Sequence, residues 1–121
     1  MKYEVQDRIY VTCLYNCGEV RVLSMLFDTG AVRTVVCSDS LEGVEIHPTG
    51  RHQKFRTATR EPVVLSEIVV PQFTVGNIDM RDCRIWTGDD ITDLLGLDLL
   101  SKVNWRYLPD ERMLEVTGAC L

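Results

Sequence analysis

Asp28 is the residue whose type and position first suggest chemistry. It lies between an apolar run that ends at Phe27 and a turn formed by Thr29 and Gly30. An acid at the end of a buried strand loses hydration that a surface acid keeps, so it requires an explanation beyond solubility. A carboxylate in such a place can act as a general acid or base. By itself, Asp-Thr-Gly is also typical of an ordinary hydrogen-bonded turn between a strand and a loop.

A second stretch makes the pattern more specific. Residues 93–100 form an apolar run that contains Gly96 and continues as a short helical pattern. Together the two stretches resemble the retropepsin-like aspartic proteases. In that family an apolar strand carries Asp-Thr-Gly-Ala, a Thr follows, and an apolar-apolar-Gly segment later precedes a short helix. The matching residues are Asp28, Thr29, Gly30, Ala31, Thr34, Leu94, Leu95 and Gly96, and the resemblance covers about residues 8–116.

The resemblance implies a fold and a catalytic loop. The implied fold is mostly β, a closed acid-protease barrel with one short helix near the C-terminus, functional as a homodimer. Asp28 is the implied catalytic residue. The residues implied to support its loop are Thr29, Gly30, Ala31 and Thr34, and those implied to pack behind it are Leu94, Leu95 and Gly96.

The family's flap, a hairpin that closes over substrate, is expected at about residues 57–63. Its substrate-binding residues would be Thr57, Ala58, Thr59, Arg60, Glu61 and Pro62. Flap tips in the family usually carry Gly, which permits unusual backbone angles and close approach to a peptide, whereas this tip is Arg60-Glu61-Pro62. The charged pair is interpreted either as a solvated turn or as a contributor to substrate choice.

Peptide hydrolysis by carboxylates requires two acids in different protonation states. One takes a proton from the attacking water, and the other donates a proton to the carbonyl oxygen. Asp28 cannot fill both roles, and the sequence has one Asp-Thr-Gly with no second acid in an equivalent turn. A two-fold axis between two chains would place Asp28 against its symmetry mate, so that the pair shares a proton. The resemblance implies that Thr29 forms a hydrogen bond across that axis. It also implies that Gly30 lets the substrate backbone approach closely and that Ala31 keeps the side chain in the cleft wall small.

Periodicity and turn residues predict the elements that position Asp28. Residues 9–15 and 19–27 predict a hairpin around Asn16-Cys17-Gly18 that ends at Asp28. A strand is expected at 35–36, and Ser38-Asp39-Ser40 predicts a capped helical turn. Residues 44–47 predict a short strand, residues 48–50 a loop, and residues 51–54 an exposed polar segment.

The second half of the chain predicts mainly hairpins. Strands at 55–59 and 63–70 join across the expected flap tip, and those at 73–75 and 78–80 flank Gly76-Asn77. Leu97, Leu100 and Val103 have helical spacing. Residues 105–108 and 113–116 predict a last hairpin, and residues 117–121 a tail or an edge strand.

Composition limits the class of protein. A chain of 121 residues is expected to form a single domain, residues 1–121, which buries roughly two-thirds of its unfolded surface. The sequence has no run of about 20 apolar residues, and acids occupy the start where a signal peptide has its apolar stretch. A cytoplasmic protein without a membrane partner is therefore expected. The formal charge of -5 and the scattered Lys and Arg argue against nucleic acid as a partner.

Cysteine and histidine usage favours free thiols over a metal site. The five cysteines are an odd number at irregular positions, which is typical of a reducing compartment. Cys13, Cys17, His47 and His52 offer zinc ligands in principle, but the usual paired spacing of cysteines is missing. Free thiols and surface histidines are expected, with no metal and no organic cofactor.

Three functions fit these observations. The first is a homodimeric aspartic endopeptidase that cleaves an extended peptide with apolar side chains at the scissile bond. The second is a catalytically weak or inactive module of the same fold that dimerises or binds peptides, because family membership indicates fold more securely than catalysis. The third is a small β-barrel without enzymatic ancestry, with Asp28 on the surface of a monomer. The first two have a second copy of the chain and a peptide or protein substrate as partners.

Overall fold

The computed structural model describes residues 1–56 and 61–119. The elements are β1 (Lys2–Glu4), β2 (Tyr10–Asn16), β3 (Val20–Phe27), β4 (Val35–Cys37), the 3-10 helix η1 (Ser38–Leu41), β5 (Pro48–Arg56), β6 (Pro62–Val75), β7 (Ile78–Gly88), β8 (Leu94–Leu95), α1 (Leu97–Leu100), β9 (Val103–Leu108) and β10 (Met113–Ala119). The expected mostly β fold with a short α-helix near the C-terminus is confirmed. In these two ranges, no helix has the length and apolar character needed to cross a membrane.

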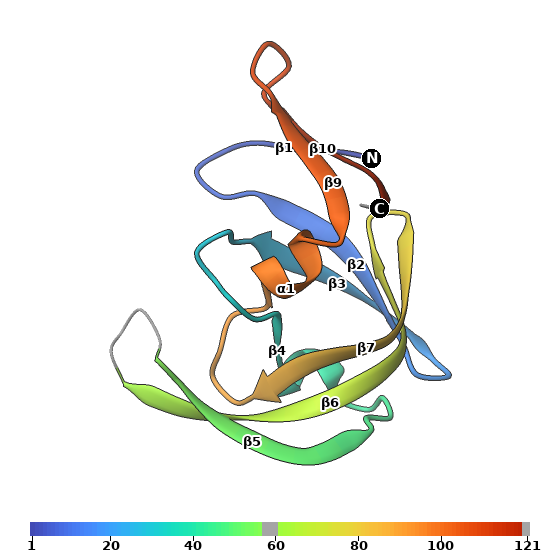
Figure 1. Ribbon diagram of the computed structural model, residues 1–121, viewed down its shortest axis with the longest axis vertical. Coiled ribbons are helices and arrows are strands. Elements are labelled where there is room, and N and C mark those ends of the chain that lie inside the picture. Colours follow the sequence, from blue (N-terminus) through green and yellow to red (C-terminus); the bar gives the residue numbers. More distant parts are fainter. Residues whose placement is uncertain (57–60, 120–121) are drawn as a thin grey trace.

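The strands form two sheets (Figure 1). A three-stranded sheet has the order β1-β10-β9, and a seven-stranded sheet has the order β2-β3-β8-β4-β7-β6-β5. β2 also pairs with β6, which links two strands that are distant in the order of the larger sheet. Neighbouring strands are antiparallel except for β3 with β8 and β4 with β7, which are parallel. These two parallel pairs flank the loop between β3 and β4, where Asp28 lies.

Alternation of side chains along the strands directs apolar groups to the interior. In β2, Val11, Cys13 and Tyr15 are buried while Tyr10 and Thr12 are exposed, as a strand with one solvated face requires. The main core combines such residues from the strands of both sheets with others from α1. Burial of this apolar surface, worth about 25 cal/mol per Å², is the main stabilising contribution.

Three predicted hairpins are confirmed, and each is defined by local turn chemistry. β2 and β3 join at Asn16-Cys17-Gly18, where Gly18 has a φ of 99° and donates its N–H to Asn16 Oδ1 at 3.1 Å. β6 and β7 join at Gly76, whose φ is 64°. The last hairpin joins β9 to β10. Positive φ angles are accessible to Gly without a steric penalty, so the sequence marks the first two turns directly.

Other local predictions are wrong, and in each case sheet pairing decides the outcome. Residues 44–47 form no strand, and residues 48–50 form no loop, because β5 begins at Pro48 opposite Ile68 of β6. The polar residues 51–54 are exposed as expected, but they belong to β5. β6 continues through residues 71–72, where the sequence suggests a break, because it pairs with β7 along most of its length.

The helical predictions also require correction. α1 ends at Leu100, and Val103 begins β9 instead of continuing the helix. The turn η1 forms where it is expected, but no side chain caps it. Ser38 Oγ instead donates to Asp89, and Ser40 Oγ donates to Asp93 Oδ2 at 2.7 Å. Strand β1, which pairs with β10, is not predicted by the sequence pattern, and residues 117–119, expected as a tail or an edge strand, continue β10.

Candidate active site

Asp28 directly follows the last residue of β3. Its N–H donates to the carbonyl of Leu95 at 3.1 Å, and the N–H of Phe27 donates to the carbonyl of Ile9 at 2.8 Å. In the parallel pairing of β3 with β8, Leu94 lies opposite Leu26 and Leu95 opposite Phe27. The Leu94-Leu95 segment therefore lies beside the strand that carries Asp28.

A tight turn orients the half-buried Asp28 carboxylate. Gly30 N–H donates to Asp28 Oδ1 at 2.9 Å, and Ala31 N–H donates to the Asp28 carbonyl at 3.2 Å. A Cβ on Gly30 would lie 3.1 Å from Asp28 Oδ1, so the missing side chain allows this close contact. Among residues 1–56 and 61–119, no donor makes a hydrogen bond to the second carboxylate oxygen, Oδ2. Thr29 and Gly30 are exposed.

Thr34 connects the loop to α1 through buried hydrogen bonds. Its hydroxyl donates to Asp98 Oδ1 at 2.7 Å and accepts from Gly96 N–H at 3.0 Å. Its own N–H donates to Asp98 Oδ2 at 3.0 Å. Thr34 is fully buried, so loss of these bonds would leave polar groups without water as a substitute. These hydrogen bonds therefore tie the loop after β3 to α1.

Gly96 permits the backbone of the loop to lie directly on the start of α1. A Cβ at this position would lie 2.5 Å from the carbonyl carbon and oxygen of Arg33 and 3.0 Å from the carbonyl oxygen of Ala31. The next N–H groups bind the loop, with Leu97 donating to Ala31 O at 2.8 Å and Asp98 to Val32 O at 3.2 Å. The missing side chain at Gly96 therefore permits this close packing.

Two acids that sequence reasoning left without a role hold the loop and its neighbours. Asp98 accepts from Thr34, as described, and from Leu99 N–H at 2.9 Å. Asp93 Oδ1 accepts from Cys37 N–H at 2.7 Å, and its carbonyl accepts from Leu26 N–H at 2.9 Å. The signal was available in the sequence, because acids that flank an apolar run must find hydrogen-bond donors when the run is buried.

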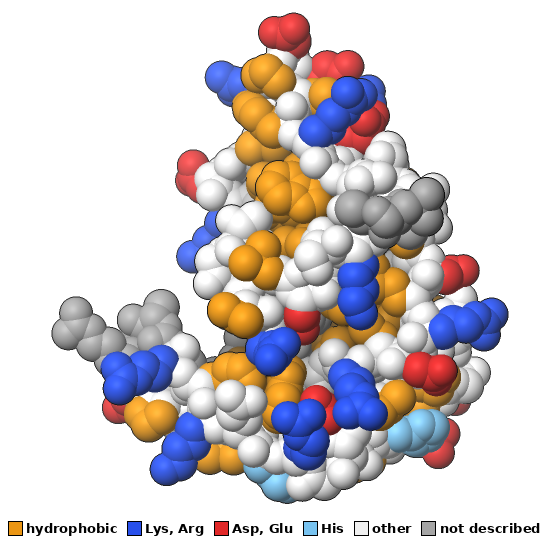
Figure 2. Space-filling model, in the orientation of Figure 1, with side chains coloured by type: hydrophobic (Ala, Val, Ile, Leu, Met, Phe, Trp, Pro, Cys, Tyr) orange, Lys and Arg blue, Asp and Glu red, His pale blue; other side chains and the backbone are white. Residues whose placement is uncertain are grey.

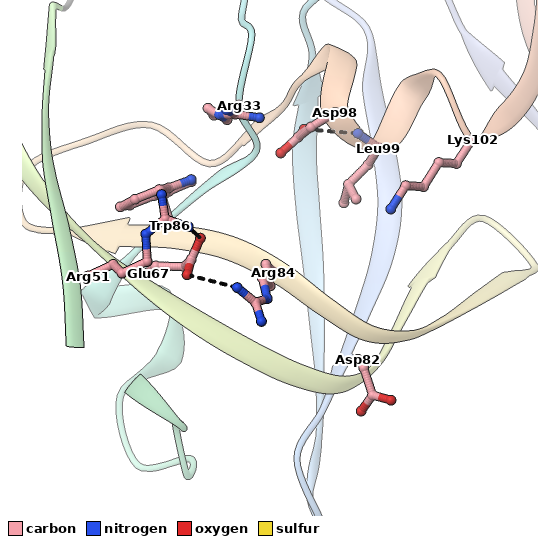
Figure 3. Close-up of a pocket in the computed structure, with 9 residues that line it drawn as sticks. All are labelled: Arg33, Arg51, Glu67, Asp82, Arg84, Trp86, Asp98, Leu99 and Lys102. Atoms are coloured by element: carbon pink, nitrogen blue, oxygen red, sulfur yellow. Dashed lines mark hydrogen bonds and ion pairs between the residues drawn. The ribbon is translucent and has the colours of Figure 1, made fainter. Parts of the chain in front are cut away.

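A pocket of about 320 Å³ lies beside the loop (Figure 3). One side, here called the loop wall, consists of Arg33, Asp98, Leu99 and Lys102. The facing side, here called the sheet wall, consists of Arg51, Glu67, Asp82, Arg84 and Trp86, from β5, β6 and β7. The lining residues come from five separated segments of the chain, so no local sequence pattern predicts this pocket.

Glu67 is the charged centre of the sheet wall. Its side chain is only 5% exposed and lies 3.4 Å from Arg51 Nη1 and 3.7 Å from Arg84 Nη1. Thr49 Oγ1 also donates to Glu67 Oε1 at 2.9 Å. Arg51 lies over the Trp86 ring with its guanidinium 6.0 Å from the centroid. One buried carboxylate thus pairs with two mostly exposed cationic side chains at the rim of the pocket.

The pocket carries more positive than negative charge. Arg33 and Lys102 make no side-chain hydrogen bond or ion pair with any described residue, whereas Asp98 already accepts hydrogen bonds at both oxygens. Glu67 is shared by two arginines. Of the lining charges that have no such partner among the described residues, two are cationic, Arg33 and Lys102, and one is a carboxylate, Asp82.

The expected flap lies only partly in the described structure. Thr57, Ala58, Thr59 and Arg60 lie outside the described residues. Glu61 is exposed, and Pro62 begins β6 opposite Arg56 of β5. Figure 1 shows that this end of the β5–β6 hairpin and the loop after β3 lie on the same side of the molecule.

Exposed apolar side chains gather near the Asp28 loop. Figure 2 shows hydrophobic side chains along the part of the surface formed by β9 and α1. The exposed members near this site are Val32, Leu97, Trp105 and Tyr107. The Trp105 ring makes an edge-to-face contact with Phe27, the residue before Asp28, with centroids 5.0 Å apart. A patch of this kind is typical of a surface that associates with another molecule.

Comparisons with known proteins agree with this geometry. A family model described as aspartyl protease matches residues 11–99. The crystal structure of a retropepsin-like aspartic protease from Rickettsia conorii matches with a TM-score of 0.65 and 18% identity, over 100% of this chain and 92% of that chain. A search of curated protein sequences found no match. At 18% identity the structural likeness shows the fold alone. The family relationship is shown by the match of the family model to the sequence.

Proposed function

The chain belongs to the aspartyl protease family and is retropepsin-like, and from this premise we propose that it is a homodimeric aspartic endopeptidase. Each chain contributes one catalytic residue, Asp28. The closed acid-protease barrel, with residues 1–121 as a single domain, belongs to this proposal.

The turn around Asp28 is the observation that carries the proposal. Gly30 N–H fixes Oδ1, while Oδ2 receives no hydrogen bond from a described residue. The exposed Thr29 and Gly30 leave this face of the turn accessible. A second chain on the same face, related by a two-fold axis, would place its own carboxylate next to the first.

The two carboxyl groups would divide the chemistry between them. The ionised group removes a proton from a water molecule as its oxygen attacks the carbonyl carbon of the substrate, and the protonated group donates to the carbonyl oxygen. The C–N bond then breaks as the leaving nitrogen takes a proton from one carboxyl group, while a hydroxyl of the tetrahedral intermediate returns its proton to the other carboxylate and restores the singly protonated pair. Two adjacent negative charges repel each other, so one shared proton is the favoured state of the free enzyme.

The surface around the turn supports a dimer. The exposed residues Val32, Leu97 and Trp105 offer apolar area that a second chain would remove from water. In the family resemblance, Thr29 makes its hydrogen bond across the axis and holds the two acids coplanar. Exposure of Thr29 in a single chain is compatible with that role.

The charges of the pocket favour a substrate with an acidic side chain away from the scissile bond. Arg33 and Lys102 on the loop wall lack ionic partners among the described residues, and Arg84 faces them from the sheet wall. A carboxylate that enters the pocket would form charge-assisted hydrogen bonds with these groups. We expect apolar side chains to flank the cleaved bond itself.

A second candidate is an inactive or weakly active dimerisation or peptide-binding module of the same fold. Its supporting observation is the sequence Arg60-Glu61-Pro62 at the expected flap tip, where a Gly would permit close approach to substrate. The flap residues would then bind a peptide without closing tightly over it.

Incubation with a diverse peptide mixture between about pH 4 and 7 tests the proposal, because acid dyads operate in this range. We expect cleavage between apolar residues and inhibition by a statine-type compound. No cleavage at any pH would favour the inactive module. Sedimentation that shows only monomers at every accessible concentration would contradict both functions that depend on a dimer.

A further inference from the structure

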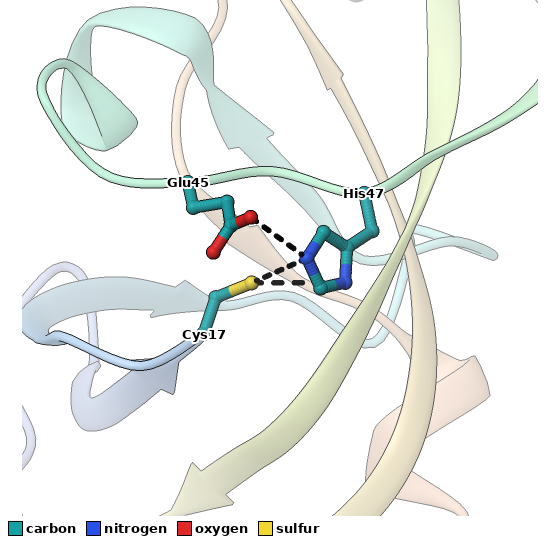
Figure 4. A group of neighbouring side chains, drawn as sticks. All are labelled: Cys17, Glu45 and His47. Carbon is teal, nitrogen blue, oxygen red and sulfur yellow. Dashed lines mark hydrogen bonds and ion pairs between the residues drawn. The ribbon is translucent and has the colours of Figure 1, made fainter.

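A second group of chemically capable side chains lies away from Asp28. Cys17 is in the β2–β3 turn, and Glu45 and His47 are in the segment between η1 and β5 (Figure 4). Figure 1 places that turn on the side of the molecule opposite the loop after β3. The three ligand atoms lie within 4.8 Å of one another.

Two of these side chains approach the same nitrogen of the His47 ring. Cys17 Sγ lies 3.4 Å from His47 Nε2, and Glu45 Oε1 also lies 3.4 Å from it. Nε2 cannot accept a hydrogen bond from the thiol and donate one to the carboxylate at the same time, and the thiol lies farther, 3.8 Å, from the other ring nitrogen, Nδ1. A nucleophile with a base and an orienting acid would instead use opposite nitrogens of the ring. One ion between the three atoms accounts for their convergence.

We propose that Cys17, Glu45 and His47 form a Zn²⁺ site with three protein ligands and one water. In a tetrahedral zinc site with ordinary bond lengths, sulfur and nitrogen are about 3.5 Å apart, and nitrogen and oxygen about 3.3 Å apart. The Sγ–Nε2 and Nε2–Oε1 distances, both 3.4 Å, are close to these edges. Sulfur and nitrogen ligands also select Zn²⁺ over Ca²⁺ or Mg²⁺, which prefer oxygen.

The surroundings hold the ligands in place. Tyr15, which is fully buried, donates its hydroxyl to the Glu45 carbonyl at 2.7 Å. The carbonyl of His47 accepts from Val69 N–H at 2.9 Å. Both ligand-bearing backbone positions are thereby tied to the sheet, while the half-exposed His47 and exposed Glu45 side chains leave a path for the ion from solvent.

Ion binding would change the protonation of Cys17. Burial raises the pKa of the Cys17 thiol, and the nearby Glu45 carboxylate raises it further. On binding, the thiol proton passes to solvent and the sulfur donates to Zn²⁺ as a thiolate. The ion would clamp the β2–β3 turn to the segment before β5, with no part in the chemistry of Asp28.

Titration of the reduced, metal-free full chain tests the site. We expect one Zn²⁺ per chain by calorimetry, a higher unfolding temperature with Zn²⁺, and a thiolate-to-metal absorption band when Co²⁺ replaces Zn²⁺. Cys17→Ser should abolish this band. Cys17→Ser and His47→Gln should each weaken Zn²⁺ binding by about 10-fold or more, since even loss of an outer-shell partner has effects of this size.

His52→Gln and Cys37→Ser are matched controls that should retain full binding. His52 is exposed on β5 next to Ser66, and Cys37 lies at the end of β4. Circular dichroism of each variant shows whether it is folded. Glu45→Gln provides a third test of the proposed ligands, at an exposed position. Absence of stoichiometric Zn²⁺ binding, or binding unchanged in both Cys17→Ser and His47→Gln, would overturn the proposal.

Discussion

The two walls of the pocket beside Asp28 are held by different kinds of interaction. On the side of the loop wall, Thr34, Gly96 and Asp98 form a buried network in which main-chain N–H groups take part. On the sheet wall, Arg51 and Arg84 are 64% and 63% exposed and surround the buried Glu67. Hydrogen bonds to the main chain fix a position closely, whereas exposed arginines can change rotamer.

Under the proposed function, this difference separates the part of the site that performs catalysis from the part that recognises substrate. A catalytic carboxylate must be held within a fraction of an ångström, so the residues behind its loop can vary little. A surface that recognises a side chain by charge tolerates movement and replacement. The comparison predicts large effects for substitutions in the loop network and small effects on folding for those in the sheet wall.

The largest effect is expected for Asp28→Asn. Asparagine can still accept a hydrogen bond from Gly30, so the turn should persist while the general base is lost. Peptide cleavage should fall by at least about 10²–10⁴-fold. Analytical ultracentrifugation at pH 7 should show a dimer at least as tight as the parent's, because the repulsion between two carboxylates is gone. An active Asp28→Asn variant would exclude Asp28 as the catalytic acid.

Thr34→Val tests the buried network. The substitution keeps the shape of the side chain but leaves Gly96 N–H without an acceptor, at a cost to the free energy of unfolding of about 1–3 kcal/mol. Urea denaturation measures this loss. Thr12→Val on the exposed face of β2 is the control and should change stability by less than about 0.5 kcal/mol. Equal effects of the two substitutions would refute the support role of Thr34.

Thr29→Ala should affect association more than folding. Thr29 is exposed in the single chain, so its proposed hydrogen bonds, each worth about 0.5–1.5 kcal/mol, exist only across the dimer axis. The dimer dissociation constant should rise while the denaturation midpoint, measured where the chain is monomeric, stays unchanged. Thr29→Ser should be mild. If Thr29→Ala associates as tightly as the parent, the assignment across the axis is wrong.

Arg84→Gln should have the smallest effect on folding. Its side chain is mostly exposed, and ion pairs of this kind contribute about 0–1 kcal/mol to stability. The expected change is instead in substrate choice, measured as kcat/KM for paired peptides with Glu or Gln at the recognised position. The preference for Glu should decrease several-fold in Arg84→Gln and persist in the control Arg106→Gln, which lies on β9. An unchanged preference would show that the sheet wall does not recognise the substrate side chain.

The sequence predicted those parts of the fold that local chemistry specifies. The turns at Gly18 and Gly76 are marked by residues that accept positive φ angles, and Asp28 follows an apolar strand as expected. Strand β1 and the start of β5 at Pro48 depend on partners far along the chain, β10 and Ile68, which no local pattern identifies.

The same distinction applies to the candidate sites. The motif Asp28-Thr29-Gly30 is contiguous and was recognised, whereas the role of Asp98 depends on its contact with Thr34. Cys17 and His47 are zinc ligands in principle, but their spacing along the chain argues against a site. In the folded chain the β2–β3 turn and the segment before β5 bring them together. Spacing along the chain cannot reveal such a group.

The hydrogen bonds between Thr34 and Asp98 join residues 64 positions apart, which has a consequence for the order of folding. Loop-closure entropy opposes such distant contacts, so they tend to form late and slowly. In a nascent or partly folded chain, the Asp28 segment is therefore present before Gly96 and Asp98 have packed against its loop. If the chain is the endopeptidase proposed above, hydrolytic competence would then arise only after folding is nearly complete, which would protect neighbouring unfolded polypeptide from premature cleavage.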